Sequence, residues 1–187
     1  MNKPILDLLR EGGFILYARH GEATIGEDLP NLNYRYCLTQ RNLSELGRWQ
    51  AFYYGQILRK LRIPINYLIQ TSPYCRTIET AGLAFGWSNI SVDPFWAEIN
   101  NLSANISADQ QRKILDTLQT KLEIIPPQGT NKVIIAHNFP NQIGLGQIPD
   151  MGTVVIRPLG QGHGYEIIVK LTLEELGTLL NTPEYRS

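Results

Sequence analysis

The sequence predicts an α/β fold, a three-layer sandwich whose mostly parallel central sheet carries helices on both faces. Apolar runs alternate with segments of helical periodicity along the 187 residues, which is the pattern of βαβ units. Three runs are mainly apolar without strict alternation, as is typical of parallel strands buried on both faces. They are residues 14–19, 65–71 and 132–137. Because the length suits one hydrophobic core and no repeat or long linker interrupts it, we expect a single domain over residues 1–187.

The N-terminal part of the chain predicts one helix before and one helix after the first strand. Residues 5–13 favour a short helix that Gly12 and Gly13 end. A loop rich in Asn, Pro and Gly follows the strand, to about Asn42. Ser44 can then cap a long helix. The apolar face of that helix is expected to consist of Leu46, Trp49, Tyr53, Ile57 and Leu61.

The second strand is followed by a favourable helix start. Ser72 can serve as the N-cap, and Pro73 suits the first turn. We expect this helix to run to about Gly86. A short strand at residues 90–92 then precedes an irregular stretch through Asn105.

The remaining elements carry clear start and turn signals. Ser107 with Gln110 has the spacing of a capping box and predicts a helix to about Ile124. Thr172 with Glu175 has the same spacing and predicts the final helix. Two apolar segments separated by a Gly-rich turn predict a hairpin, at residues 153–158 and 165–171.

Charge and cysteine content exclude several classes of protein. With 17 basic and 17 acidic residues, bulk attraction to nucleic acid or to an anionic membrane is not expected. Asp7, Arg10 and Glu11 interrupt the N-terminal apolar run, so it does not resemble a signal peptide. No apolar run is long enough to span a bilayer, and we expect a cytoplasmic protein. Cys37 and Cys75 should then be reduced, and two cysteines cannot form a zinc ribbon.

Polar groups suited to a phosphate follow three strands. Arg19 and His20 end the first strand, residues 72–76 follow the second, and His137 ends the third. Because ligands of open α/β sheets bind at the carboxyl ends of strands, we expect these groups to meet at one edge.

These residue types together favour phosphoryl chemistry. An unprotonated histidine can attack phosphorus as a nucleophile. Arginines contact phosphoryl oxygens through bidentate hydrogen bonds, and a helix N-terminus adds backbone N–H groups. Gly21 would let the backbone pass close to an anion or adopt a tight turn. A carboxylic acid is still needed to protonate the leaving oxygen.

Five segments in this order resemble the histidine phosphatase superfamily, also called the phosphoglycerate-mutase-like family. They span most of the chain and read "ARHGEAT", "LTQRNLSELGRWQA", "TSPYCRTIETAGLAFG", "FWAEINN" and "VIIAHN". Within the superfamily the chain is similar to a branch of small bacterial phosphatases, which also carry "TQRNLS". The resemblance implies a phosphoglycerate-mutase-like fold.

The resemblance also implies a role for each matching residue. His20 corresponds to the nucleophile that becomes phosphohistidine, and Glu98 to the general acid, with Glu22 as the next candidate for that acid. Arg41, in the loop expected over the pocket, contacts either substrate or solvent. No metal or other cofactor is implied, because arginines and imidazole take the place of a cation. By the same resemblance, Arg19, Arg76 and His137 form the phosphate pocket. We therefore expect three catalytic residues, His20, Glu98 and His137, and five substrate-binding residues, Arg19, Gly21, Glu22, Arg41 and Arg76.

The predicted function is phosphomonoester hydrolysis on a small phosphorylated substrate or a phosphoprotein. A phosphoglycerate-type mutase and a noncatalytic phosphate-binding module are the alternatives. Mutases usually carry asparagine where Gly26 stands and glycine where Asn138 stands. The crossover at residues 138–152 is also short, so we expect its helix to be truncated or absent. These departures favour hydrolysis over mutase activity.

The two cysteines flank segments that we expect at the same edge of the sheet. Cys75 precedes Arg76, and Cys37 lies in the loop that returns over that edge. We therefore predict that they are near neighbours. In a reducing cytoplasm two separate thiols are the expected state, and a disulfide would form only on oxidation.

Overall fold

The computed structural model describes residues 4–181, and its six strands form one sheet in the order β3-β2-β4-β1-β5-β6. Strands β3, β2, β4 and β1 run parallel, whereas β5 is antiparallel to both β1 and β6. The predicted mostly parallel α/β sheet is thus confirmed. The strands are β1 (Ile15–Arg19), β2 (Ile65–Thr71), β3 (Ile90–Val92), β4 (Asn131–Ala136), β5 (Thr153–Pro158) and β6 (Tyr165–Leu171).

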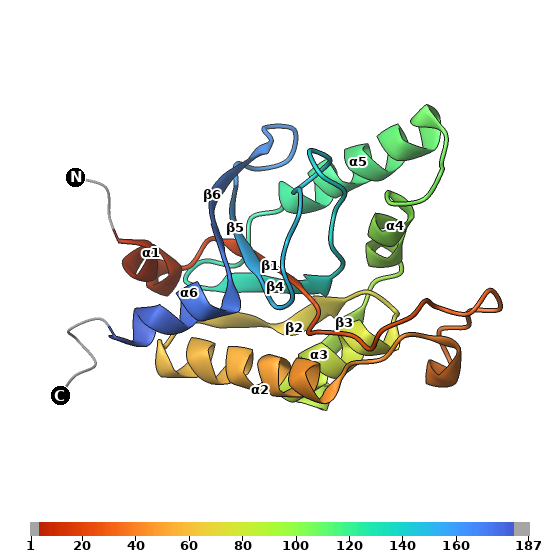
Figure 1. Ribbon diagram of the computed structural model, residues 1–187. Coiled ribbons are helices and arrows are strands. Elements are labelled where there is room, and N and C mark those ends of the chain that lie inside the picture. The colour runs from red at the N-terminus through yellow and green to blue at the C-terminus, as the bar shows by residue number, and fades with distance from the viewer. Residues whose placement is uncertain (1–3, 182–187) are drawn as a thin grey trace.

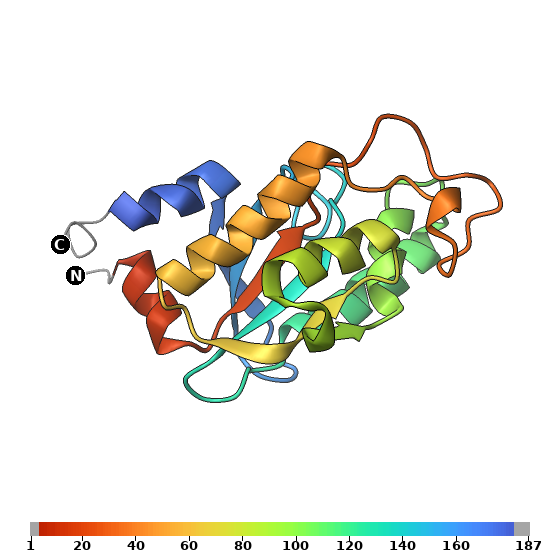
Figure 2. The same cartoon turned by 90° about the horizontal axis from the view of Figure 1, so that it is seen from below.

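Helices cover both faces of the sheet, as expected for three layers. Helices α2 and α3 lie on one face, and α4 and α5 lie on the other (Figures 1 and 2). The helices are α1 (Ile5–Glu11), α2 (Glu45–Lys60), α3 (Cys75–Phe85), α4 (Phe95–Asn101), α5 (Ala108–Leu122) and α6 (Leu173–Thr178). None of these helices, within the part of the chain described, combines the length and the apolar character needed to cross a membrane.

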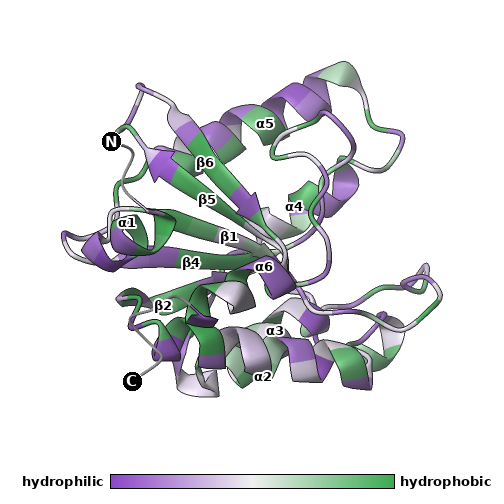
Figure 3. Cartoon of the chain, turned by 60° about the vertical axis from the view of Figure 1, so that its left-hand side comes forward, coloured by the Kyte–Doolittle hydropathy of each residue, from purple (hydrophilic) through white to green (hydrophobic). Residues whose placement is uncertain are grey.

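The alternation of side chains along the central strands creates two hydrophobic cores. On β1, Leu16 and Ala18 pack toward α2 and α3, whereas Ile15 and Tyr17 pack toward α4 and α5. All four side chains are buried. Figure 3 shows the apolar strands enclosed between the helical layers.

Local signals correctly predict most helix boundaries. Ser44 accepts a hydrogen bond from the Gly47 amide and caps α2. Complete capping boxes begin α5 at Ser107 and α6 at Thr172. Helix α1 ends at Glu11, directly before Gly12. The segment between β4 and β5 contains no helix, as expected.

The buried face of α2 differs from the predicted one. Leu46 and Trp49 are about half exposed, with relative accessibilities of 49% and 56%. Gly47 and Gly55 face the protein interior instead, where a Cβ would lie 2.0 Å and 2.1 Å from the backbone oxygens of neighbouring segments. Because backbones approach this closely only at glycine, the two glycines set the rotation of α2 about its axis.

Three further predictions are wrong in detail. Helix α3 begins at Cys75, after an N-cap at Tyr74, and not at Ser72. Part of the stretch expected to be irregular, before Asn105, forms α4. Strand β2 is exposed at Tyr67 and Leu68, where its register with β4 shifts, so it is not buried throughout.

Candidate active site

The carboxyl ends of β1, β2 and β4 bring the three predicted segments together. The His20 amide donates to the Ala136 carbonyl at 3.0 Å, and the Ser72 amide donates to the Ile135 carbonyl at 3.2 Å. His137 directly follows β4. The imidazole rings of His20 and His137 consequently lie with their centroids 5.6 Å apart and their planes at 73°.

His20 is held in the tautomer that a nucleophile requires. Its Nδ1 lies 2.6 Å from the carbonyl oxygen of Gly21, so Nδ1 carries the proton and donates it. The lone pair therefore resides on Nε2, which makes no hydrogen bond with any residue of the described range 4–181. Burial first, and the charge of Arg76 second, lower the pKa of His20 from 6.5 to about 3. The ring is therefore neutral at pH 7.

His137 is the second buried imidazole of the site. Its Nε2 lies 2.8 Å from the Ser72 hydroxyl, and the Tyr74 ring packs against it with centroids 4.7 Å apart. Burial, followed by the neighbouring His20 and arginine charges, holds the pKa of His137 well below its usual value. Its Nδ1 is buried and has no partner among the described residues.

Arg76 is a buried cation on the first turn of α3, with a side chain only 4% exposed. Its Nη1 and Nη2 atoms bind the two carboxylate oxygens of Asp28 at 2.9 Å and 3.2 Å. The guanidinium also stacks on the ring of Tyr74, 4.2 Å from its centroid. The guanidinium of Arg76 is thus held at its end by Asp28 and on its planar face by Tyr74.

Arg19 is anchored by the loop that precedes β5. Its Nη1 donates to the Ile148 carbonyl at 3.0 Å, and its Nη2 lies 2.9 Å from a carboxylate oxygen of Asp150. The Nε of Arg19 is buried and lacks a hydrogen-bond partner within residues 4–181. A loop carboxylate therefore binds the end of each guanidinium group: Asp150 binds Arg19, and Asp28 binds Arg76.

Together these groups can bind an oxyanion beside a nucleophile. Two neutral imidazoles and two fixed guanidinium groups lie at one sheet edge, where burial first and the arginine charges after it lower the pKa of both histidines. Unpartnered buried donors are costly, and Arg19 Nε would gain a strong bond to a phosphoryl oxygen. The arrangement therefore suits attack by His20 Nε2 on a bound phosphoryl group.

The two candidate acids differ in their surroundings. Glu98 is exposed on α4, where its carboxylate accepts a hydrogen bond from Asn101 at 2.8 Å. Tyr34 lies in the loop between β1 and α2 and packs on Tyr74 with ring centroids 5.1 Å apart; burial first, then Tyr74, and to a smaller extent the charge of Glu98 raise the pKa of its phenol. Glu22 is half-buried and accepts a hydrogen bond from the Ser44 hydroxyl at 2.7 Å. No contact within the described part of the chain joins either carboxylate to His20.

Gly21 and Arg41 both lie next to the site. A Cβ on Gly21 would stand 2.5 Å from the backbone oxygen of Gly47, so close packing against α2 gives one reason for glycine there. The Gly21 amide donates to the Thr80 hydroxyl at 3.2 Å. Arg41 belongs to the loop over the site; its charge contributes to the low pKa of His20, and its amide donates to Asp28.

Four residues that contact the imidazoles and arginines have no predicted contact of this kind. Asp28 and Asp150 lie in irregular loops with no motif around them, and no sequence signal marks them. Ser72 and Tyr74 belong to the segment after β2 that the sequence places at this edge, but it predicts a helix cap for Ser72 and no role for Tyr74. The position of these two residues at the end of a strand is the signal that places them near the site.

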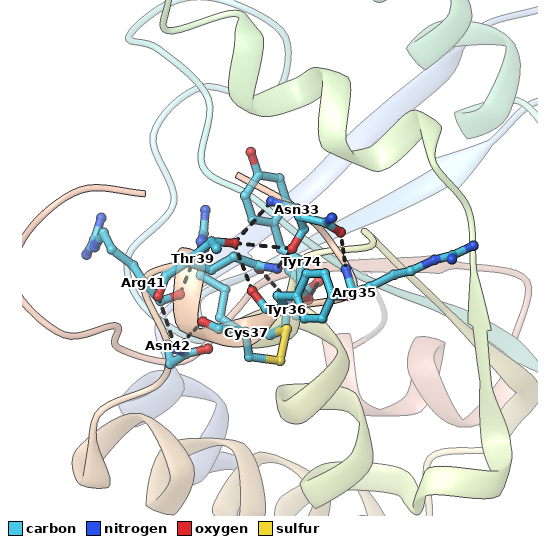
Figure 4. Close-up of a disulfide and its surroundings, with 12 residues drawn as sticks. Asn33, Arg35, Tyr36, Cys37, Thr39, Arg41, Asn42 and Tyr74 are labelled. Atoms are coloured by element: carbon cyan, nitrogen blue, oxygen red, sulfur yellow. Dashed lines mark hydrogen bonds between the residues drawn. A yellow bond between two sulfur atoms is a disulfide. The ribbon is translucent and has the colours of Figure 1, made fainter. Parts of the chain in front are cut away.

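Cys37 and Cys75 form a disulfide with a Cα–Cα distance of 5.7 Å. The predicted proximity is confirmed, and the expectation of two separate thiols is wrong for this structure. Figure 4 shows the bridge in the loop, where the Asn42 amide also donates to the Cys37 carbonyl at 2.8 Å. The bridge ties the loop to the first residue of α3, directly before Arg76.

The buried imidazoles predict a loss of stability in acid. Unfolded histidine takes up a proton as the pH falls through 6.5, whereas folded His20 stays neutral down to about pH 3. Within that window the unfolded state binds more protons, so the free energy of unfolding falls as the pH falls. The slope reaches at most about 1.4 kcal/mol per pH unit for each such histidine.

Urea unfolding between pH 7 and 4 measures this slope. His20→Asn should flatten it, and the exposed His163, replaced by asparagine as a control, should leave it unchanged. An equal slope in the wild type and in His20→Asn would show that His20 is not the buried neutral group.

Comparison with known proteins identifies the fold. No family model and no curated protein matches the sequence. Phosphoserine phosphatase from Entamoeba histolytica, solved with 3-phosphoglyceric acid, superposes with a TM-score of 0.57 at 16% identity, over 87% of this chain and 98% of its own. The alpha-ribazole phosphatase from Shigella flexneri superposes with a TM-score of 0.56 at 13% identity, over 86% of this chain and 96% of its own. The chain therefore has the fold of these phosphatases, the phosphoglycerate-mutase-like fold that its sequence motifs led us to expect.

Proposed function

We propose that the chain is a phosphomonoester hydrolase that works through a phosphohistidine on Nε2 of His20. The observation that carries this proposal is the state of His20, which is buried, neutral and oriented by the Gly21 carbonyl beside two anchored arginines. The substrate is a small phosphorylated molecule or a phosphoprotein. The names of the solved phosphatases that share the fold support the same class of reaction.

The reaction proceeds in two displacements at phosphorus. The Nε2 lone pair of His20 forms a P–N bond while the P–O bond to the leaving group breaks, and an acid supplies the proton that the leaving oxygen needs. A water molecule then attacks phosphorus and gives a proton to the carboxylate that acted as the acid, the P–N bond breaks with its electron pair returning to Nε2 of His20, and inorganic phosphate leaves. Arg19 and Arg76 offset the negative charge of the phosphoryl oxygens, and we propose that no metal is needed for this.

Trapping of the phosphoenzyme tests the proposal. The protein is mixed with a phosphomonoester labelled in its phosphoryl group and is then denatured rapidly without acid. The label should stay on the protein as phosphohistidine, which is stable in base and labile in acid. Turnover of p-nitrophenyl phosphate should persist in EDTA. Transfer of label to a second substrate hydroxyl in place of water would indicate a mutase, and phosphate binding without any turnover would indicate a binding module.

We propose Glu98 as the general acid, and its effect should depend on the leaving group. A poor leaving group needs a proton far more than p-nitrophenolate does. Glu98→Gln should therefore lower kcat/KM for an alkyl phosphate by about 100-fold and for p-nitrophenyl phosphate by less than about fivefold. Glu22→Gln is the matched comparison. A larger leaving-group dependence in Glu22→Gln would assign the acid to Glu22, and equal losses for both substrates in Glu98→Gln would exclude it as the acid.

A further inference from the structure

We propose that Asp28 is a positioning residue, which orients the guanidinium of Arg76 so that one free edge faces the phosphoryl group. The proposal rests on the proposed function, because it concerns the same site. Asp28 lies in the loop between β1 and α2, which extends past the carboxyl edge of the sheet (Figure 1).

The geometry leaves a defined edge of Arg76 for the substrate. A guanidinium has five N–H donors in a planar fork. The Asp28 carboxylate takes one donor each from Nη1 and Nη2, and the second Nη1 donor binds the Arg41 carbonyl at 3.2 Å. The donors that remain are Nε–H and the second N–H of Nη2. These two point the same way and match two oxygens of a phosphoryl group.

Asp28 therefore holds Arg76 without competing for the phosphate. The Asp28 carboxylate binds the end of the Arg76 guanidinium, at Nη1 and Nη2. The phosphoryl group would bind the other edge of the guanidinium, at Nε and Nη2. Asp28 also accepts a hydrogen bond from the Arg41 amide at 2.8 Å, so its own orientation is fixed. Asp28 and Arg41, thirteen residues apart in the same loop, thus both bind the guanidinium of Arg76.

The charge of Asp28 matters as well as its shape. The Arg76 side chain is 4% exposed and the Asp28 side chain is 20% exposed, so the pair is largely shielded from water. In Asp28→Asn the amide keeps one acceptor oxygen, but its NH₂ group would face a guanidinium N–H. One of the two bonds and the charge attraction are then lost, and the guanidinium can rotate away from its productive orientation.

Asp28→Asn should lower kcat/KM for p-nitrophenyl phosphate by about 10- to 100-fold, the cost of a misplaced catalytic group. It should weaken inhibition by vanadate, which mimics the transition state, more than inhibition by phosphate. The control is Glu79→Gln. Glu79 lies on α3, as Arg76 does, and pairs with Arg48 of α2 at 2.6 Å; its loss should change kcat/KM by less than about twofold.

A double-mutant cycle with Arg76→Ala separates positioning from a general structural role. If Asp28 acts through Arg76, Asp28→Asn should cause little further loss in the Arg76→Ala background. If Asp28→Asn does not fold, Asp28→Glu moves the carboxylate by one methylene and serves the same cycle.

Two results would overturn the role of Asp28 alone: wild-type kinetics and vanadate inhibition in Asp28→Asn, or an undiminished loss in the Arg76→Ala background. A wild-type protein that neither hydrolyses p-nitrophenyl phosphate nor binds vanadate would instead overturn the proposed function, and this proposal with it.

Discussion

Replacing His20 with alanine is expected to lower kcat/KM for p-nitrophenyl phosphate on the order of 10⁴-fold or more, the scale seen when an enzyme loses its nucleophile. The reason is that no other described residue offers an unprotonated nitrogen in the same position. The His137 ring follows another strand, with its centroid 5.6 Å from that of His20, and its Nε2 is engaged with Ser72, so neither of its nitrogens takes the place of His20 Nε2. Both guanidinium groups are cations without a usable lone pair. The label-retaining phosphoenzyme should vanish together with the turnover.

The fold should survive this substitution, because His20 lies at the edge of the sheet and its backbone bonds do not depend on the ring. Its amide still donates to Ala136 and its carbonyl still accepts from Met151. His163→Ala is the matched control, since this imidazole is exposed in the turn between β5 and β6. Activity within about tenfold of the wild type in a folded His20→Ala protein would remove His20 from the reaction.

The sequence alone predicts the elements that depend on local patterns. The capping residues Ser44, Ser107 and Thr172 act through bonds to amides three residues away, so their effect is readable from the sequence. The edge where His20 and His137 meet also follows from sequence, because parallel strands end at one side of a sheet. The motifs then supplied the expected roles of these residues.

The features that were mispredicted or missed depend on contacts between distant segments. The helical pattern of α2 favoured Trp49 on the buried face, but the close approach of Gly47 to Glu22 rotates the helix away from that arrangement. Ser72 suited a helix cap locally, yet its hydroxyl binds His137, 65 residues later. Asp28 meets Arg76 across 48 residues, and nothing in the adjacent sequence marks that pairing.

Reduction of the bridge between Cys37 and Cys75 is expected to lower the free energy of unfolding by roughly 3–4 kcal/mol, because the sequence separation of 38 residues closes a long loop. For a chain of this size that corresponds to a fall in Tm of about 10 °C. Cys37 is exposed, so a dithiol reductant can reach it without prior unfolding.

Activity should respond much less than stability, because the loop keeps other attachments to the start of α3 when the bridge is open. The side chain of Gln40 accepts a hydrogen bond from the Cys75 amide at 2.8 Å. The ion pair between Asp28 and Arg76 is also independent of the disulfide. We expect kcat/KM at 25 °C to fall by less than in Asp28→Asn, because the bond that orients Arg76 remains. Thermal unfolding and kinetics with and without dithiothreitol measure both quantities, and Cys37→Ser should match the reduced wild type and be insensitive to the reductant. A Tm that does not change on verified reduction would show that the disulfide adds no stability. A large loss of activity at unchanged Tm would show that the disulfide, and not the Asp28–Arg76 pair, holds the loop in place.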